Sequence, residues 1–106
     1  MNNEMELQLG DRLFEWDENK NRINKQKHKI DFKTAAQVFN DENRKEYYDF
    51  EHSSINEDRY KVFGKVNDIL VVVYTERGIK TRIITAWIAE AHERKIYYGD
   101  SELYPT

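Results

Sequence analysis

The chain contains no cysteine, and only one proline and four glycines occur among its 106 residues. Without cysteine the protein can form neither a disulfide framework nor a cysteine-ligated metal site, and it has no thiol nucleophile. The few glycines form no phosphate-binding loop and no nucleophile elbow. The sequence therefore gives no support for hydrolysis of nucleotides or for thiol chemistry.

Long apolar runs are also absent, since the longest stretches only from Ile69 to Tyr74. That run is too short to cross a bilayer, which requires about 20 residues. The N-terminus, residues 1–6, has neither the basic start nor the apolar stretch of a secretory signal. We therefore expect a cytoplasmic protein without membrane contact. The three histidines form no clustered metal-ligand set in the sequence, so we expect no metal site and no cofactor.

Charge is unevenly distributed along the chain. The net charge of −3 argues against a general nucleic-acid binder, which usually carries a basic excess. Residues 20–33, however, hold six basic side chains and His28 against the single acid Asp31. This segment predicts a local anion-binding patch on an acidic body, and a solvated helix face is the alternative interpretation.

Periodicity predicts a single α+β domain over residues 13–99, with a loose leader at 1–12 and a tail at 100–106. We expect an antiparallel four-stranded sheet plus a short N-terminal strand, two N-terminal helices and one C-terminal helix. The N-cap candidates Asp17 and Asp31 mark the starts of the first two helices. The expected strands cover 13–16, 44–50, 58–66, 69–75 and 80–88, and the expected helices cover 17–28, 31–40 and 89–98.

Several side chains on these elements suit cleavage of RNA without a metal. Such a reaction needs a base for the 2′-hydroxyl, an acid for the leaving 5′-oxygen and cations for the phosphorane. We assign the base to Glu57 and the acid to His28 or His52, and a histidine as base also remains open. Arginine presents a planar charged fork to phosphate oxygens. The predicted catalytic residues are therefore Glu57, Arg59, Arg82, His28 and His52.

Two further cations are candidate contacts to the substrate. Lys27 precedes His28 at the end of the basic helix, where it could hold a phosphate group. The alternative is that both side chains only stabilise the helix C-terminus through its dipole. Arg77 precedes Arg82 on the turn before the last strand and offers a second guanidinium.

Taken in order, residues 14–98 resemble the BrnT toxin family of type II toxin–antitoxin systems. The resemblance rests on collinear elements: Phe14-Glu15-Trp16-Asp17, Lys20, Asn24, Lys27-His28, Asp31-Phe32, Ala35-Ala36, Val38-Phe39, His52, Glu57-Asp58-Arg59, Gly64, Val71 to Thr75, Arg77-Gly78, Arg82-Ile83-Ile84, Ala86, Ala89 and Glu93-Arg94. It implies a RelE-like, barnase-like fold and a toxin that cuts RNA endonucleolytically without metal and inhibits translation and growth. It further implies neutralisation by a BrnA-type antitoxin, whose ribbon-helix-helix region links the pair indirectly to operator DNA.

The chain departs from the family pattern at Trp87, where the family commonly has an arginine. A tryptophan can stack on a base, a contact worth roughly 1–3 kcal/mol, so Trp87 is a predicted substrate-binding residue. Loss of one transition-state cation can cost on the order of 100-fold in rate. The alternative function is therefore a catalytically weak or inactive toxin-like module that binds an antitoxin or RNA without cleavage.

Overall fold

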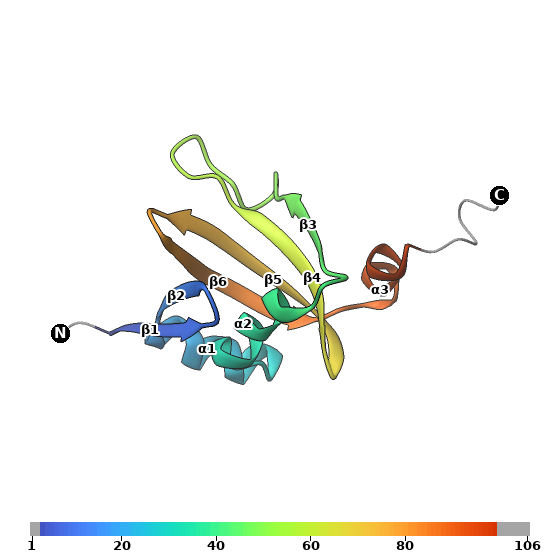
Figure 1. The fold of residues 1–106 in the computed structure, drawn as a ribbon, viewed down its shortest axis with the longest axis horizontal. Coiled ribbons are helices and arrows are strands. Elements are labelled where there is room, and N and C mark those ends of the chain that lie inside the picture. Colours follow the sequence, from blue (N-terminus) through green and yellow to red (C-terminus); the bar gives the residue numbers. More distant parts are fainter. Residues whose placement is uncertain (1–2, 100–106) are drawn as a thin grey trace.

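A computed structural model describes residues 3–99, which form a six-stranded sheet of order β1-β2-β6-β5-β4-β3 (Figure 1). The strands are β1 (Glu4–Leu9), β2 (Arg12–Asp17), β3 (Lys45–Tyr48), β4 (Tyr60–Val66), β5 (Asp68–Arg77) and β6 (Lys80–Ile88). The helices are α1 (Glu18–His28), α2 (Phe32–Ala36) and α3 (Ala91–Tyr98), with a 3-10 helix at Gln37–Asn40.

The sheet corrects our expectation of a four-stranded antiparallel sheet with a separate N-terminal strand, which is wrong. β2 joins the same sheet by pairing in parallel with β6, and β1 pairs with β2 in antiparallel fashion. Residues 4–9, which we expected in a loose leader, form β1 because their apolar residues alternate. Leu7 and Leu9 pack against the core, whereas Glu4 and Glu6 point the other way. The expected tail at 100–106 lies outside the described residues.

The N-terminal helices begin at the predicted caps. The carboxylate of Asp17 accepts from Asn19 N at 2.8 Å, and that of Asp31 accepts from Lys33 N at 2.9 Å. The second helix is shorter than expected, because the chain tightens into the 3-10 helix after Ala36. This 3-10 helix lies directly against Gly64 of β4, where an added Cβ would stand 2.6 Å from the Val38 Cβ.

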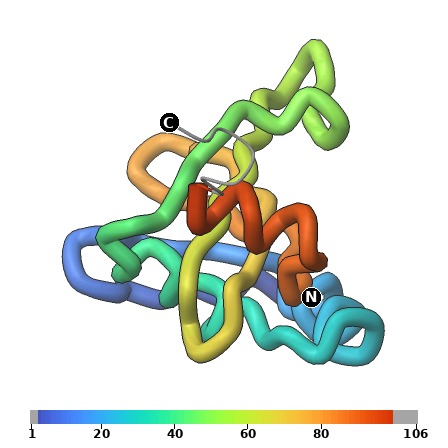
Figure 2. The backbone as a smooth tube through the Cα atoms, turned by 90° about the vertical axis from the view of Figure 1, so that its right-hand side faces the viewer, coloured from blue at the N-terminus to red at the C-terminus, as the bar shows by residue number. Residues whose placement is uncertain are grey.

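The two faces of the sheet differ in their cover. α2 and the 3-10 helix bury one face through an apolar cluster that includes Phe14, Phe32 and Val72. Among residues 3–99, the apolar cover of the opposite face lies at one end, where Tyr97 of α3 packs with Phe63 and Val71. In Figure 2 the C-terminal helix, in red, lies apart from the blue-green helices α1 and α2. We call the second face the open face.

A register shift between β5 and β6 determines which side chains of β6 lie on the open face. Tyr74 lies opposite Ile83, but Val73 lies opposite Thr85, so one residue of β6 is skipped. After the shift, Thr85 and Trp87 share the open face with Val73 and Val71 of β5. Within residues 3–99, no helix is long and apolar enough to cross a membrane.

Candidate functional site

Helix α1 is attached to the sheet through one buried amide side chain. β2 pairs only with the beginning of β6, so another group must satisfy the backbone of Ala86. Asn24 does so, because its Nδ2 donates to Ala86 O at 2.9 Å and its Oδ1 accepts from Ala86 N at 3.1 Å. His28 follows one helical turn later and therefore faces the same strand. Its ring centroid lies 6.2 Å from that of Trp87.

The turn after β3 positions the second histidine by means of a buried carboxylate. The Asp49 side chain is 2% exposed, and its Oδ1 accepts from the backbone N–H groups of Glu51 at 3.1 Å and His52 at 3.2 Å. Its Oδ2 lies 2.6 Å from Nδ1 of His52. A carboxylate can only accept here, so the proton of the neutral imidazole lies on Nδ1. Nε2 is then the unprotonated nitrogen of the ring.

Trp87 lies at the meeting point of these elements. The ring of His52 is 6.4 Å from Trp87, and the Nζ of Lys61 stands 5.7 Å from the indole centroid. The indole Nε1 donates to the buried carboxylate of Glu93 at 3.1 Å, which fixes the ring orientation. The structure thus brings together three of the predicted residues, His28, His52 and Trp87, which come from three different elements. We call these three residues the Trp87 cluster.

The basic helix contributes a small cation-lined pocket beside this cluster. Its volume is about 180 Å³, and Lys20, Lys27 and His28 line it together with Thr85 of β6. Three side chains that can carry positive charge surround a space large enough for a phosphate group. The predicted phosphate contact Lys27 therefore lies next to the Trp87 cluster.

Glu57 lies between two arginines on the loop that precedes β4. Its Oε1 accepts from Arg59 Nε at 2.7 Å, and its Oε2 accepts from Arg77 at 3.0 Å. The hydrogen bond from Arg59, followed by that from Arg77, lowers the pKa of Glu57 below its ordinary value. The predicted base thus forms a cluster with two predicted cations, and its carboxylate binds a proton weakly.

Arg82 lies in a network of acidic residues rather than beside the histidines. Its guanidinium donates to Glu15 of β2 at 3.0 Å and to both carboxylate oxygens of Glu4 on β1. The hydrogen bond that Arg82 donates to Glu4 is the main cause that raises the pKa of Arg82 above its ordinary value. Lys80 pairs in the same way with Glu6. These contacts attach β1 and β2 to β6 across their exposed side.

Asp49, Lys61 and Glu93 each contact or orient a group near Trp87, and none of them was predicted as a site residue. A signal for Asp49 existed, because an aspartate three residues before a histidine in a turn can bond both the backbone and the ring. No local pattern links Lys61 or Glu93 to a residue on another strand. Asp49, Glu51 and His52 also offer ligand atoms within 4.8 Å of one another, so this group is the candidate for a cation among the described residues.

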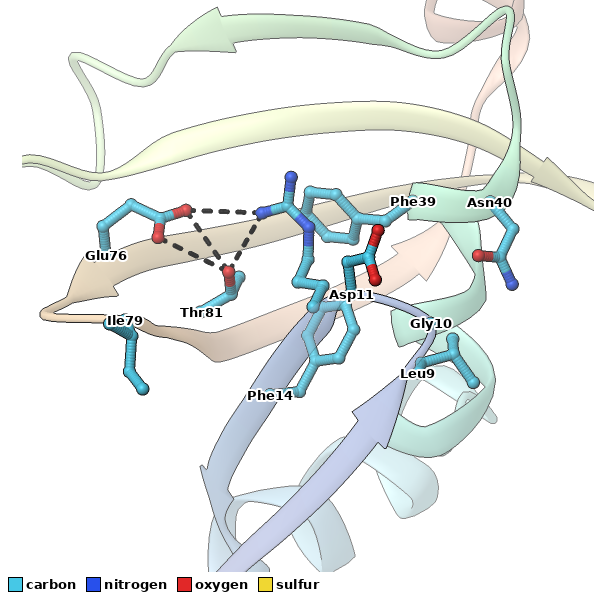
Figure 3. A pocket seen from close by; sticks show the side chains of 10 residues that line it. Leu9, Gly10, Asp11, Phe14, Phe39, Asn40, Glu76, Ile79 and Thr81 are labelled. Atoms are coloured by element: carbon cyan, nitrogen blue, oxygen red, sulfur yellow. Dashed lines mark hydrogen bonds and ion pairs between the residues drawn. The ribbon is translucent and has the colours of Figure 1, made fainter.

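A separate pocket of about 390 Å³ opens beside the turn between β1 and β2 (Figure 3). The guanidinium of Arg12 lies 4.3 Å from the Phe39 ring centroid, bonds Thr81 at 3.0 Å and pairs with Glu76 at 3.6 Å. None of the predicted site residues lines this pocket. Arg12 and Glu76 in its lining pair with each other, and the pocket lies apart from the Trp87 cluster.

Comparison with known proteins supports the resemblance found in the sequence. A family model described as "Ribonuclease toxin, BrnT, of type II toxin-antitoxin system" matches residues 16–93. The crystal structure of the Brucella abortus ribonuclease toxin BrnT aligns with a TM-score of 0.55 and 22% identity, covering 71% of this chain and 92% of that chain. No curated protein matches the chain. Since the family model covers well over half of the sequence, the chain belongs to the BrnT family of ribonuclease toxins of type II toxin–antitoxin systems.

Proposed function

We propose that the chain is an endoribonuclease that cleaves RNA without a metal ion at the Trp87 cluster and thereby inhibits translation and growth. Membership of the BrnT family supports the ribonuclease class. The hydrogen bond of 2.6 Å between Asp49 and His52 is the observation that supports placing the reaction at the Trp87 cluster. A histidine oriented by a buried carboxylate is an arrangement used in general acid–base catalysis.

The reaction needs one proton removed and one proton supplied. A base takes the proton of a ribose 2′-hydroxyl, and the 2′-oxygen bonds to phosphorus while the bond from phosphorus to the 5′-oxygen breaks. The 5′-oxygen takes a proton from an acid, and a 2′,3′-cyclic phosphate remains. We assign the base to Nε2 of His52, which carries no proton in the neutral ring whose Nδ1–H donates to Asp49. His28, whose ring also lies beside Trp87, is the acid.

Glu57 is the alternative base, and it meets a physical obstacle. Both of its carboxylate oxygens already accept hydrogen bonds from Arg59 and Arg77. These charge-assisted bonds favour the ionised carboxylate and lower its pKa, so Glu57 takes a proton from a hydroxyl only weakly. In our proposal Glu57 instead holds the two guanidinium groups in place on the open face, where they contact the RNA phosphates.

Cations near the histidines stabilise the phosphorane. Lys27 reaches it from the pocket on α1, and Lys61 reaches it from β4. Arg82 can contact the phosphorane only after its hydrogen bonds to Glu4 break, so we assign it no direct contact with phosphate. Trp87 provides a flat, oriented ring between the histidines and Lys61 on which a base or a ribose can rest.

A type II system pairs its toxin with a protein antitoxin, and we propose a BrnA-type partner for this chain. In this proposal the antitoxin carries a ribbon-helix-helix region, and the toxin reaches operator DNA only through it. Co-expression tests the assignment, because a BrnA-type protein should restore the growth of cells that express this chain and co-purify with it. Growth arrest that persists despite a folded BrnA-type partner contradicts the assignment.

Cleavage of purified single-stranded RNA in EDTA tests the catalytic proposal. We expect cleavage by the wild-type chain and a loss of at least about 100-fold in His52→Ala and in His28→Ala. His92→Ala is the matched control, because this α3 histidine is 71% exposed and pairs only loosely with Glu90 at 3.8 Å. Equal rates in His52→Ala and His92→Ala would remove His52 from the mechanism. Activity that returns only with added divalent cations would contradict the metal-free reaction.

The second candidate function is a toxin-like module that binds without cleaving. One specific observation favours it: Arg82 is already paired with Glu4 and Glu15. In addition, Trp87 occupies the position at which the family commonly has an arginine. On this hypothesis the wild-type chain binds RNA or antitoxin but neither cleaves RNA nor stops growth. Trp87→Arg would then gain cleavage activity, whereas an active wild-type chain excludes this hypothesis.

A further inference from the structure

A groove on the open face borders the proposed catalytic cluster. Its volume is about 530 Å³, and its lining comes from β3, from the turn after it, from β4 and from α3. The lining side chains that matter here are Tyr47, Phe50, Phe63, Lys61 and Ile96. The groove is therefore a second concave surface on the face that carries the histidines.

The groove presents aromatic rings to solvent. Phe50 is 86% exposed and Tyr47 is 48% exposed. Each ring rests edge-on against a neighbour: Phe50 lies 4.6 Å from Tyr48, and Tyr47 lies 5.9 Å from Phe63. These contacts fix the rings while leaving most of Phe50 uncovered. Exposed rings held in place by their neighbours suit stacking better than exposed aliphatic side chains do.

Two residues connect the groove to the catalytic cluster. Lys61 lines the groove, and its ammonium stands 5.7 Å from the Trp87 ring. Asp49 lines the groove as well, and it is the residue that orients His52. A nucleotide whose phosphate lies at Lys61 and His52 thus has the aromatic groove within reach of its neighbouring base.

We propose that this groove is a base-binding subsite, in which a nucleobase of single-stranded RNA next to the scissile phosphate stacks on Phe50 and Tyr47. Lys61 holds the phosphate that lies between this base and the Trp87 cluster. The ammonium of Lys61 gives the groove a positive charge at the end nearest that cluster. Glu51, at the groove itself, repels phosphate and so leaves this space to an uncharged base. The subsite deepens the proposed function and rests on its placement of the reaction at Trp87.

The aromatic lining of the groove, with Lys61 at the end nearest the Trp87 cluster, favours a nucleobase of RNA as its occupant. The chain has a net charge of −3, so phosphate contacts alone supply limited affinity for a polyanion. Stacking adds affinity without requiring positive charge, and it tolerates any base because every base has a π-face. An aromatic groove with a cation at its inner end is the combination that proteins use for single strands.

Binding of an uncleavable RNA tests the subsite separately from catalysis. The probe is a single-stranded oligonucleotide with 2′-O-methyl groups throughout, labelled for fluorescence anisotropy at fixed salt. We expect Phe50→Ala and Tyr47→Ala each to weaken binding about 5- to 150-fold, the range measured for loss of one stacked base. Ile79→Ala is the matched control, because this residue is equally exposed at 86% but lines the pocket of Figure 3. Its affinity should equal that of the wild type.

Salt dependence and an abasic probe distinguish stacking from charge. Phe50→Ala should leave the slope of log affinity against log salt unchanged, whereas Lys61→Ala should reduce it by about 0.7. An oligonucleotide that lacks bases should bind wild type and Phe50→Ala equally well. Equal binding of the complete oligonucleotide by wild type, Phe50→Ala and Tyr47→Ala overturns the proposal.

Two outcomes keep the subsite distinct from other hypotheses. If the groove variants keep RNA affinity but lose binding to a BrnA-type antitoxin, the groove is a protein interface and the subsite is wrong. If the wild type does not cleave RNA but Phe50→Ala still weakens oligonucleotide binding, the proposed cleavage is wrong and the subsite is supported.

Discussion

Replacement of Asp49 by asparagine isolates the role of a single proton in the proposed site. Asparagine keeps an oxygen that can accept from the N–H groups of Glu51 and His52, so the turn is preserved. Its amide nitrogen, however, replaces the oxygen that lies 2.6 Å from Nδ1 of His52. Because an amide NH₂ donates, Nδ1 must become the acceptor and the proton of the neutral ring moves to Nε2. The nitrogen assigned as base is then already protonated.

The expected loss in rate is therefore large and the expected loss in stability is small. Asp→Asn beside the catalytic histidine of a serine protease lowers kcat about 10⁴-fold, and general acid–base catalysis is worth 10²–10⁴-fold. We expect the Asp49→Asn chain to cleave about 10²- to 10⁴-fold more slowly than wild type. One charge-assisted hydrogen bond is replaced by a neutral one, so the free energy of unfolding should fall by only about 1–2 kcal/mol.

Two measurements on the same protein test this reasoning. Single-turnover cleavage gives the rate, and the ¹⁵N resonances of the imidazole of His52 report which ring nitrogen carries the proton. Wild type should show the neutral ring protonated on Nδ1, and Asp49→Asn should show it protonated on Nε2. A proton on Nε2 in wild type would refute the argument before any activity is measured. An unchanged rate after a demonstrated tautomer switch would remove His52 as base.

Three further predictions concern the framework of the site. Gly64→Ala should destabilise the fold by about 1–3 kcal/mol in chemical denaturation, because its Cβ would stand 2.6 Å from the Val38 Cβ and 3.0 Å from the Val38 oxygen. Asn24→Ala should lower the free energy of unfolding by about 1–3 kcal/mol by leaving buried backbone groups unpaired, and should reduce cleavage. Arg77→Ala should move the acid-unfolding midpoint to higher pH. The lowered pKa of Glu57 gives stability above its unfolded pKa that is lost as pH falls through the folded value, and the substitution raises that folded value.

The helices and the central strands could be predicted because their signals are local. The caps at Asp17 and Asp31, the alternation of β4 and the apolar run of β5 each lie within a few residues. The mixed sheet could not be predicted, because its parallel strand pair joins Leu13 with Lys80. No local sequence pattern near either residue indicates that pairing. β1 was missed because its alternating leucines lie among acidic and amide residues, which lower the apparent β-propensity of the segment.

The site shows the same division between local and distant information. Residue type and the resemblance singled out His28 and His52, but their meeting at Trp87 depends on the register shift in β6 and on the Asn24 bridge. Asp49 lay within reach of local reasoning. Lys61 did not, because its relation to Trp87 crosses the width of the central strand.

Arg82 shows why chemical character alone does not assign a role. A guanidinium at the start of a half-buried strand needs a partner, and we predicted phosphate as that partner. The structure supplies two carboxylates instead, Glu15 from β2 and Glu4 from β1, and β1 lies outside the residues that the family model matches. Any phosphate that reaches Arg82 must compete with both carboxylates on the same guanidinium. The strand that carries Glu4 therefore limits what Arg82 contributes to the positive surface of the open face.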